Sequence, residues 1–283
     1  MPELPEVQTV VSQVGEKLTG KKIMTVWSDW QKRTLPSFEL FAKRVQRTVI
    51  LGTRRFGKHI VIDLDNMYSI VIHLKMTGHL LIKNDANRMS DAFIKDPMNG
   101  YIHHCIGFSD GTTLEFSDMR KFGWMKVLET DEVENLPSIL SLGVDAISKQ
   151  FTTDFFQKLI VKREKKSIGA LLLEQNLIAG IGNIYRSEAL FLAGVLPTRL
   201  LGTLSIEEQH RSVVSVKKVL KQALQLRGMS DGDFRDTDGL EGQFQKTRHV
   251  YGRTDEPCKK CGTIIVRKKI GQRSIFYCPK CQR

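Results

Sequence analysis

Four cysteines near the carboxyl end form the pattern with the clearest chemistry in this sequence. Cys258 and Cys261 form one CxxC pair, Cys278 and Cys281 form a second, and sixteen residues separate the pairs. Two thiolate pairs at this spacing are typical of a tetrahedral zinc site that leaves no coordination position open for catalysis. Disulfide bonds are the alternative, which a reducing cytosol disfavours. The pattern predicts one structural Zn²⁺.

Basic residues are concentrated in the same part of the chain. The 283 residues carry a formal net charge of +12, and residues 246–283 hold eleven basic side chains against two acidic ones, a net +9. Between the cysteine pairs, residues 263–277 read as two short strands around Gly271, a hairpin too small to fold without a metal. Such a hairpin would present Arg267, Lys268, Lys269 and Arg273. These features predict a polyanionic partner, and by themselves indicate only a nucleic-acid-binding or protein-binding zinc ribbon.

The start of the chain has two interpretations. Pro2 followed by Glu3 and Glu6 is ordinary chemistry for the beginning of a helix. Alternatively, removal of Met1 exposes the secondary amine of Pro2 as a nucleophile. An α-amino group titrates near pH 8 and a lysine near 10.4, so the unprotonated fraction is on the order of a hundred times larger at neutral pH. Glu3 would be the adjacent carboxyl for proton transfer, with Glu6 on the same helix face.

The elements that must position these residues differ between the two halves of the chain. Apolar residues recur at helical spacing from Glu3 to Leu18, and Gly20 ends that helix. Residues 23–128 contain short strand-like runs, including 60–64, 69–74 and 113–116, and the turn signal Asp110-Gly111. Helices are expected at 153–162, 169–176, 184–193 and 207–226, the last one behind a Ser205/Glu208 capping box. We expect an α+β protein: an N-terminal antiparallel β-sandwich with an N-terminal helix, then a helical domain with a β-hairpin zinc finger.

Composition excludes several classes of protein. A hydrophobic fraction of 41% and a charged fraction of 26% argue against disorder. No apolar run approaches the roughly 18 residues of a membrane span, so no membrane partner is expected. Glu3 and Glu6 stand where a secretory signal would need a basic and then an apolar stretch. We therefore expect a cytoplasmic protein.

Three motifs together resemble the bacterial formamidopyrimidine-DNA glycosylases. They are Met-Pro-Glu-Leu-Pro-Glu-Val at residues 1–7, Gly-Ile-Gly-Asn-Ile-Tyr at residues 180–185, and the terminal four-cysteine finger. They occur in the family's order and the likeness covers essentially the whole chain. It implies a monomeric enzyme of base excision repair that acts on damaged double-stranded DNA and associates with the bacterial nucleoid. Its activities would be those of a DNA-formamidopyrimidine glycosylase, which excises 8-oxoguanine and formamidopyrimidines, and of a lyase for apurinic or apyrimidinic sites.

The resemblance also implies a division of the chain into four parts. Residues 1–136 would form the catalytic β-sandwich domain and residues 137–150 a linker. Residues 151–245 would form a helix-two-turn-helix DNA-binding domain, and residues 246–283 the zinc finger.

Catalytic roles follow from matching positions in the family. Pro2 is the position whose amine attacks the sugar C1′ of the damaged nucleotide, giving a Schiff base and then β- and δ-elimination. Glu3 matches the residue that transfers a proton at the sugar. Lys58 matches a strand lysine that holds a phosphate near the lesion, and Arg273 a finger arginine that grips the phosphates around it together with Asn183.

The remaining matches concern the extruded nucleotide, because a base inside a duplex cannot be reached at C1′. Met76, Arg120 and Phe122 match three residues that fill the gap the base leaves, and Arg120 can also bond the orphaned cytosine. Without the resemblance, Met76 and Phe122 would be read as core residues. His73 matches a phosphate contact, and residues 228–242 match a loop that closes over the extruded base.

Two other functions remain open at this point. An endonuclease VIII-like enzyme for oxidised pyrimidines shares the overall plan, but Leu4 and the set Met76, Arg120 and Phe122 argue against it. A non-catalytic zinc-ribbon DNA-binding protein would explain the charge and the cysteines without any chemistry at Pro2. Borohydride trapping on a lesion-containing duplex separates an enzyme from the non-catalytic alternative, because only an enzyme gives a covalent adduct that Pro2→Gly abolishes.

Overall fold

The computed structural model describes residues 1–270 and 272–283, apart from the side chain of Ile270. The turn expected around Gly271 lies outside these residues. The chain divides into two compact units, which are described separately. The first contains Met1–Leu140 and Leu226–Gln245, and the second contains Ser141–Gln225 and Lys246–Arg283.

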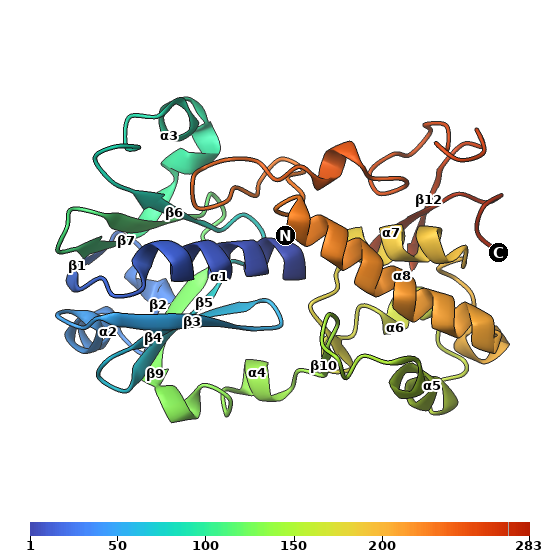
Figure 1. The fold of residues 1–283 in the computed structure, drawn as a ribbon, viewed down its shortest axis with the longest axis horizontal. Coiled ribbons are helices and arrows are strands. Elements are labelled where there is room, and N and C mark those ends of the chain that lie inside the picture. Colours follow the sequence, from blue (N-terminus) through green and yellow to red (C-terminus); the bar gives the residue numbers. More distant parts are fainter. Residues whose placement is uncertain (271) are drawn as a thin grey trace. The chain divides into compact units, whose positions relative to one another are not determined.

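The first unit is built on two sheets, as Figure 1 shows. One sheet has the strand order β2-β9-β5-β4-β3 and the other β1-β7-β8-β6. Neighbouring strands are antiparallel except β2 and β9. The prediction of an antiparallel sandwich is confirmed. The strands are β1 Ile23–Ser28, β2 Thr34–Leu35, β3 Ile50–Phe56, β4 His59–Leu64, β5 Tyr68–His73, β6 His79–Lys83, β7 Ile102–Phe108, β8 Thr113–Ser117 and β9 Trp124–Glu129.

Helix α1 (Leu4–Leu18) lies against this sandwich and contacts β3 and β4. Its valines at three- and four-residue spacing join Leu18 in the buried core, together with side chains from both sheets. Burial of this apolar stripe is what holds the helix in place, since the hydrophobic effect is its main stabilising contribution. The other helices of the unit are short: α2 Phe38–Val45, α3 Asp91–Lys95 and α4 Pro137–Leu140.

The second unit contains the remaining helices and the terminal hairpin. Its helices are α5 Thr153–Val161, α6 Ile168–Leu171, α7 Asn183–Ala193 and α8 Ile206–Gln225, and its strands are β10 Val144–Asp145, β11 Ile178–Ala179, β12 Val266–Ile270 and β13 Arg273–Tyr277. The Ser205/Glu208 capping box of α8 is present, because each residue's side chain accepts the backbone N–H of the other. The finger strands β12 and β13 pair antiparallel.

Helix α6 is shorter than the sequence predicts. It ends at Leu171, whereas helical periodicity suggested residues 169–176. The side chain of Gln175 donates to the carbonyl of Ile181 and accepts the N–H of Gly180. Gln175 therefore stabilises a reversal of the chain direction, which a helix continuing to residue 176 would prevent.

Residues 226–245 follow the last long helix in sequence but pack as part of the first unit. The carbonyl of Thr237 accepts the N–H of Ile82 in β6 (2.8 Å), and the N–H of Thr237 donates to the side chain of Gln13 in α1 (3.0 Å). The sequence grouped this segment with the helices that precede it. The structure differs because these polar contacts are made with the sandwich.

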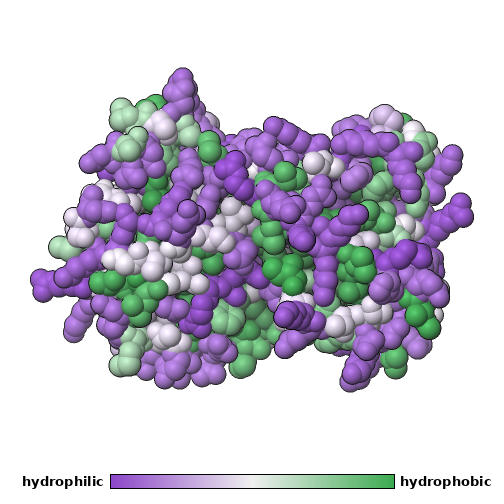
Figure 2. Space-filling view, viewed as in Figure 1, coloured by the Kyte–Doolittle hydropathy of each residue, from purple (hydrophilic) through white to green (hydrophobic). Residues whose placement is uncertain are grey.

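Within the residues described, no helix is both long and apolar enough to cross a bilayer. Figure 2 shows that hydrophilic side chains cover most of the face in view.

Candidate functional site

The start of α1 is joined to the 226–245 segment by one buried carboxylate. Glu6 accepts the N–H of Glu3 through Oε2 and the N–H of Met229 through Oε1, both at 2.7 Å. Glu3 and Glu6 are 3% and 1% exposed, and Pro2 is buried beside the exposed Met1. Gly228 has a positive φ of +80°, and a Cβ there would lie 2.5 Å from Glu6 Oε1. Glu6 therefore does more than start a helix.

Lys58 and His73 lie at the same end of the large sheet. Lys58 is buried in the turn between β3 and β4, directly after Gly57, and His73 ends β5. His59 stands edge-on to His73 with ring centroids 4.8 Å apart, and Trp124 is about 6 Å from both rings. Burial, followed by the nearby His59, lowers the pKa of His73 to about 3. His73 is therefore a neutral imidazole at physiological pH.

The three predicted gap-filling residues form one exposed cluster. The guanidinium of Arg120 lies 3.2 Å from the sulfur of Met76, and its carbon is 4.8 Å from the centre of the Phe122 ring. Met76 is 40% exposed and Phe122 is 43% exposed, so neither is a core residue. Two apolar side chains and a cation project together from two loops that are distant in sequence.

Two buried residues that sequence reasoning missed hold this cluster in shape. The carboxylate of Asp118 accepts the hydroxyl of Thr77 (2.5 Å) and the N–H of Gly123 (2.7 Å). The Thr77 oxygen also accepts the N–H of Arg120 (3.1 Å), so the two loops are cross-linked directly behind their exposed tips. Lys75 and Lys121, each beside a predicted gap-filling residue, have φ of +57° and +56°. Such conformations cost energy for residues other than glycine and cluster at functional sites.

The acidic segment 228–242 is an ordered loop in which acids have defined partners. The buried carboxylate of Asp236 accepts the N–H groups of Asp238 and Leu240, both at 3.0 Å, and pairs with Arg227 at 2.9 Å. Asp238 in turn pairs with Lys17 of α1 at 2.5 Å. The negative charge of the loop is therefore partly neutralised by basic residues of the same unit.

In the second unit, Asn183 is the first residue of α7. Gly182 is its N-cap, and Gly180 with φ +99° forms the preceding turn. The backbone N–H groups at the start of a helix favour an anion. Arg273 is the exposed first residue of β13 in the finger.

The four cysteine sulfurs have the spacing of a zinc site. All lie within 4.8 Å of one another, with Cys258 and Cys281 at 3.9 Å and Cys261 and Cys278 at 3.5 Å. A tetrahedral site with Zn–S bonds of about 2.3 Å needs sulfurs roughly 3.8 Å apart, whereas a disulfide needs about 2.05 Å. The residues fit one structural Zn²⁺, and the disulfide alternative does not apply.

A buried glutamate on α7 anchors the segment that leads into the finger. Glu188 is 1% exposed and accepts the backbone N–H groups of His249, Val250 and Tyr251, each at 2.8 Å. No local pattern signals this role, because the partners are about sixty residues away in sequence.

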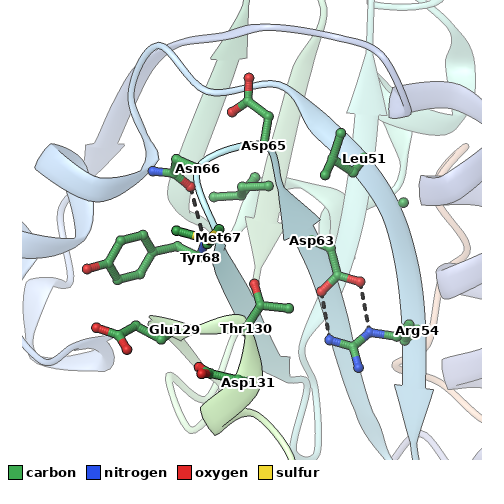
Figure 3. Close-up of a pocket in the computed structure, with 12 residues that line it drawn as sticks. Leu51, Arg54, Asp63, Asp65, Asn66, Met67, Tyr68, Glu129, Thr130 and Asp131 are labelled. Carbon is green, nitrogen blue, oxygen red and sulfur yellow. Dashed lines mark hydrogen bonds and ion pairs between the residues drawn. The ribbon is translucent and has the colours of Figure 1, made fainter.

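A surface pocket of about 800 Å³ lies at the other end of the large sheet (Figure 3). Tyr68 and Glu129, which line it, pair at one end of β5 and β9, whereas His73 and Trp124 pair at the opposite end. Arg54 and Asp63 form a two-bond ion pair in its wall. None of the predicted site residues lines this pocket. The size of the pocket therefore does not identify it as the catalytic site.

Fold and site define a class: a β-sandwich with an ordered N-terminal carboxylate cluster, combined with helices and a four-cysteine zinc finger, as in DNA-repair glycosylases. Three family models match in the same order. They are the formamidopyrimidine-DNA glycosylase N-terminal domain (residues 1–125), its H2TH domain (142–234), and the zinc finger found in FPG and IleRS (255–283).

Individual relatives match along the whole chain. The formamidopyrimidine-DNA glycosylase of Pelotomaculum thermopropionicum is 37% identical over 284 residues, covering 100% of this chain and 99% of that protein. The Lactococcus lactis enzyme in complex with DNA containing an abasic site is 31% identical, with a TM-score of 0.87 and 99% of each chain covered. The same enzyme with DNA containing an oxidised pyrimidine gives a TM-score of 0.86 over 100% of each chain. The chain belongs to the formamidopyrimidine-DNA glycosylase family, whose members are base-excision-repair DNA glycosylases with AP lyase activity.

Proposed function

We propose that Pro2, freed of Met1, is the nucleophile of this glycosylase and lyase. Its amine lone pair forms a bond to C1′ while the bond from C1′ to the base breaks, and the base departs with that electron pair and takes up a proton. Opening of the sugar ring then gives an iminium, from which β- and δ-elimination cleave the strand. Glu3 is the adjacent carboxyl that moves the proton at the sugar. The exposure of Met1 and the buried, hydrogen-bonded carboxylates that follow it support this assignment.

The exposed cluster Met76, Arg120 and Phe122 is the observation that carries the proposal furthest. An enzyme that extrudes a base needs apolar side chains to fill the space that the base leaves. It also needs a hydrogen-bond donor for the base on the opposite strand that has lost its pairing partner. A zinc ribbon that only grips the backbone has no use for such a cluster. We assign the substrate as duplex DNA with oxidised purines, such as 8-oxoguanine and formamidopyrimidines, opposite cytosine.

Phosphate binding falls to four residues in this proposal. Lys58 and His73 act in the first unit, Asn183 at the start of α7, and Arg273 on the finger, while Glu6 anchors the loop over the base. Zn²⁺ bound by the four cysteines holds the finger hairpin in shape. Phosphate contacts position the enzyme on any sequence, whereas the gap-filling cluster selects the extruded nucleotide.

The proposed division of labour follows the chain. Residues 1–136 carry the chemistry and the loop at 226–245 covers the base, whereas residues 151–225 and the finger at 246–283 bind the backbone, and residues 137–150 connect the two parts. The protein acts as a monomer on the chromosome, in the cytoplasm and associated with the nucleoid.

The test is borohydride trapping on a duplex that contains 8-oxoguanine opposite cytosine. Protein whose mature N-terminus is Pro2, verified by mass spectrometry, should form a covalent adduct that the Pro2→Gly variant lacks. Absence of an adduct with fully processed protein would refute the proposal. An adduct that forms readily with an oxidised pyrimidine but not with 8-oxoguanine would favour the endonuclease VIII-like alternative.

A further inference from the structure

Arg186 is the largest completely buried side chain among the residues that the structure describes. It lies one turn into α7, is 0% exposed, and was not singled out by any sequence motif. Its guanidinium donates to the carbonyl of Gly169 (3.1 Å) through Nη1. Through Nη2 it donates both to the side-chain oxygen of Asn183 and to the carbonyl of Ser274 (2.8 Å). One nitrogen atom thus joins the start of α7 to strand β13 of the finger.

The contact with Asn183 fixes which way its side-chain amide points. A guanidinium only donates hydrogen bonds, so the atom of Asn183 that faces it must be the oxygen. The amide orientation of an asparagine is otherwise decided only by its surroundings. With its oxygen held by Arg186, the half-buried Asn183 presents its NH₂ group on the other side. An outward NH₂ can donate to a phosphate, whereas the opposite orientation would present a repelling oxygen.

The contact with Ser274 acts on the second phosphate-binding element. Ser274 directly follows Arg273, and helix α7 packs against β13. A fixed carbonyl at Ser274 fixes the strand from which the Arg273 side chain extends. The same buried nitrogen therefore constrains the positions of both proposed phosphate donors of this unit, Asn183 and Arg273.

We propose that Arg186 is a positioning residue of the DNA interface, which orients the Asn183 amide toward phosphate and holds the finger strand of Arg273 in register with it. This inference rests on the proposed role of Asn183. The plainer interpretation is that Arg186 only stabilises packing between α7 and the finger. The two interpretations differ in whether the effects of Arg186 and Asn183 on DNA binding are coupled.

A double-mutant cycle measures this coupling directly. The affinity of the zinc-loaded protein is measured for a duplex with a tetrahydrofuran abasic analogue, for wild type, Arg186→Met, Asn183→Ala and the double variant. Asn183→Ala should weaken binding about tenfold, the usual scale for one hydrogen bond to a charged group. In the Arg186→Met background the same change should cost less than about twofold, because the amide is no longer aimed.

Arg253 provides the matched control. It is also buried in this unit, at 6% exposed, and its guanidinium donates to the carbonyls of His249 and Pro257 rather than to Asn183. In an Arg253→Met background, Asn183→Ala should keep its full tenfold cost. Equal costs of Asn183→Ala in the wild-type and Arg186→Met backgrounds would overturn the inference, while leaving borohydride trapping and the proposed function untouched.

A second measurement needs no Arg186 variant and covers the case in which Arg186→Met loses its zinc or unfolds. In the wild-type protein, the side-chain amide protons of Asn183 should exchange rapidly with water and become protected when the abasic duplex binds. Amide protons that are already protected in the free protein would show that the NH₂ group points inward, and would contradict the proposal.

Discussion

The hydrogen bond made by Nδ1 of His73 determines where the proton of its neutral ring lies. Its Nδ1 accepts the backbone N–H of Lys75 at 3.0 Å, so in the neutral ring the proton sits on Nε2. With the pKa lowered to about 3, the ring stays neutral throughout the physiological range. His73 can donate a hydrogen bond to phosphate without contributing a charge.

This state predicts how DNA affinity depends on pH. If His73 titrated near its ordinary value of 6.5, its contribution to phosphate binding would grow as pH falls from 7.5 to 5.5. We expect instead that the ratio of wild-type to His73→Gln affinity stays constant over this range, because neither side chain gains a charge. Fluorescence anisotropy titrations with an abasic duplex at fixed salt measure the ratio. A ratio that rises severalfold toward pH 5.5 would contradict the neutral donor.

Two buried carboxylates hold the loop at residues 226–245 in place. Buried Asp236 organises the turn, and Glu6 fastens the other end of the loop to the start of α1. The loop is proposed to close over an extruded base, and an abasic site has no base to cover. Excision and abasic-strand cleavage should therefore depend on the loop to different degrees.

Asp236→Asn tests this separation. Asparagine keeps one acceptor but loses the charge that pairs with Arg227, a change worth about 1–3 kcal/mol for a buried group. We expect 8-oxoguanine excision to fall about tenfold or more, with cleavage of a preformed abasic site changed less than twofold. The exposed Asp231→Asn on the same loop is the control and should leave both rates near wild type. Equal losses in both reactions of Asp236→Asn would argue against a base-specific loop.

The finger is the element that depends on the metal. Its apolar cluster is small, with Val250, Ile265 and Phe276 packed around the buried sulfurs and Phe191 of α7. So small a core cannot hold two strands by itself, and metal binding supplies the folding free energy.

Cys258→Ser should therefore release zinc and lose the DNA contacts of Arg273 together. We expect the slope of log affinity against log salt to fall in magnitude by about one or more, because at least one phosphate contact disappears. Zinc content by atomic absorption and affinity at several salt concentrations check this. Arg273→Gln, which should keep zinc and lose about one from the slope, is the matched comparison. Full affinity in a zinc-free variant would exclude the finger from the interface.

At the scale of the whole molecule, acid should destabilise the first unit. Burial lowers the pKa of His59, His79 and His104 each to about 4, and that of His73 to about 3. These groups take up protons near pH 6.5 when unfolded but resist protonation when folded, so the unfolded state binds more protons below pH 6.5. Stability must then fall as pH decreases through 6.5 toward 4.

The magnitude is about 2 kcal/mol for one such histidine between pH 7 and pH 5. All three tryptophans, Trp27, Trp30 and Trp124, lie in the first unit, so their fluorescence in urea follows its unfolding. His59→Phe retains a ring beside His73 and should reduce the loss of stability on acidification by about that amount. An unchanged pH dependence in this variant would contradict a neutral, buried His59.

Sequence reasoning named the residues whose proposed roles depend on their own chemistry. The cysteine spacing predicted the zinc site, and the resemblance named Met76, Arg120 and Phe122, which the structure brings together. Strand positions such as β4 and β8 followed from short apolar runs between turn residues. These features are local, or belong to motifs that can be read directly.

The residues that hold the site in place could not be read in the same way. Thr77 bonds to Asp118 across 41 positions, and Glu188 bonds to Val250 across 62. Arg186 reaches 88 positions to Ser274. A polar residue inside an amphipathic helix or a loop gives no periodic signal of a distant partner, because its partner is set by tertiary packing.

The most direct test of the account is to locate the covalent bond. Borohydride-trapped complex with an abasic-site duplex is digested with trypsin and nuclease, and the modified peptide is sequenced by mass spectrometry. We predict that the reduced sugar fragment is attached to the amine of Pro2, in a peptide that lacks Met1. Attachment to a lysine, Lys58 included, with Pro2 unmodified, would contradict the central claim.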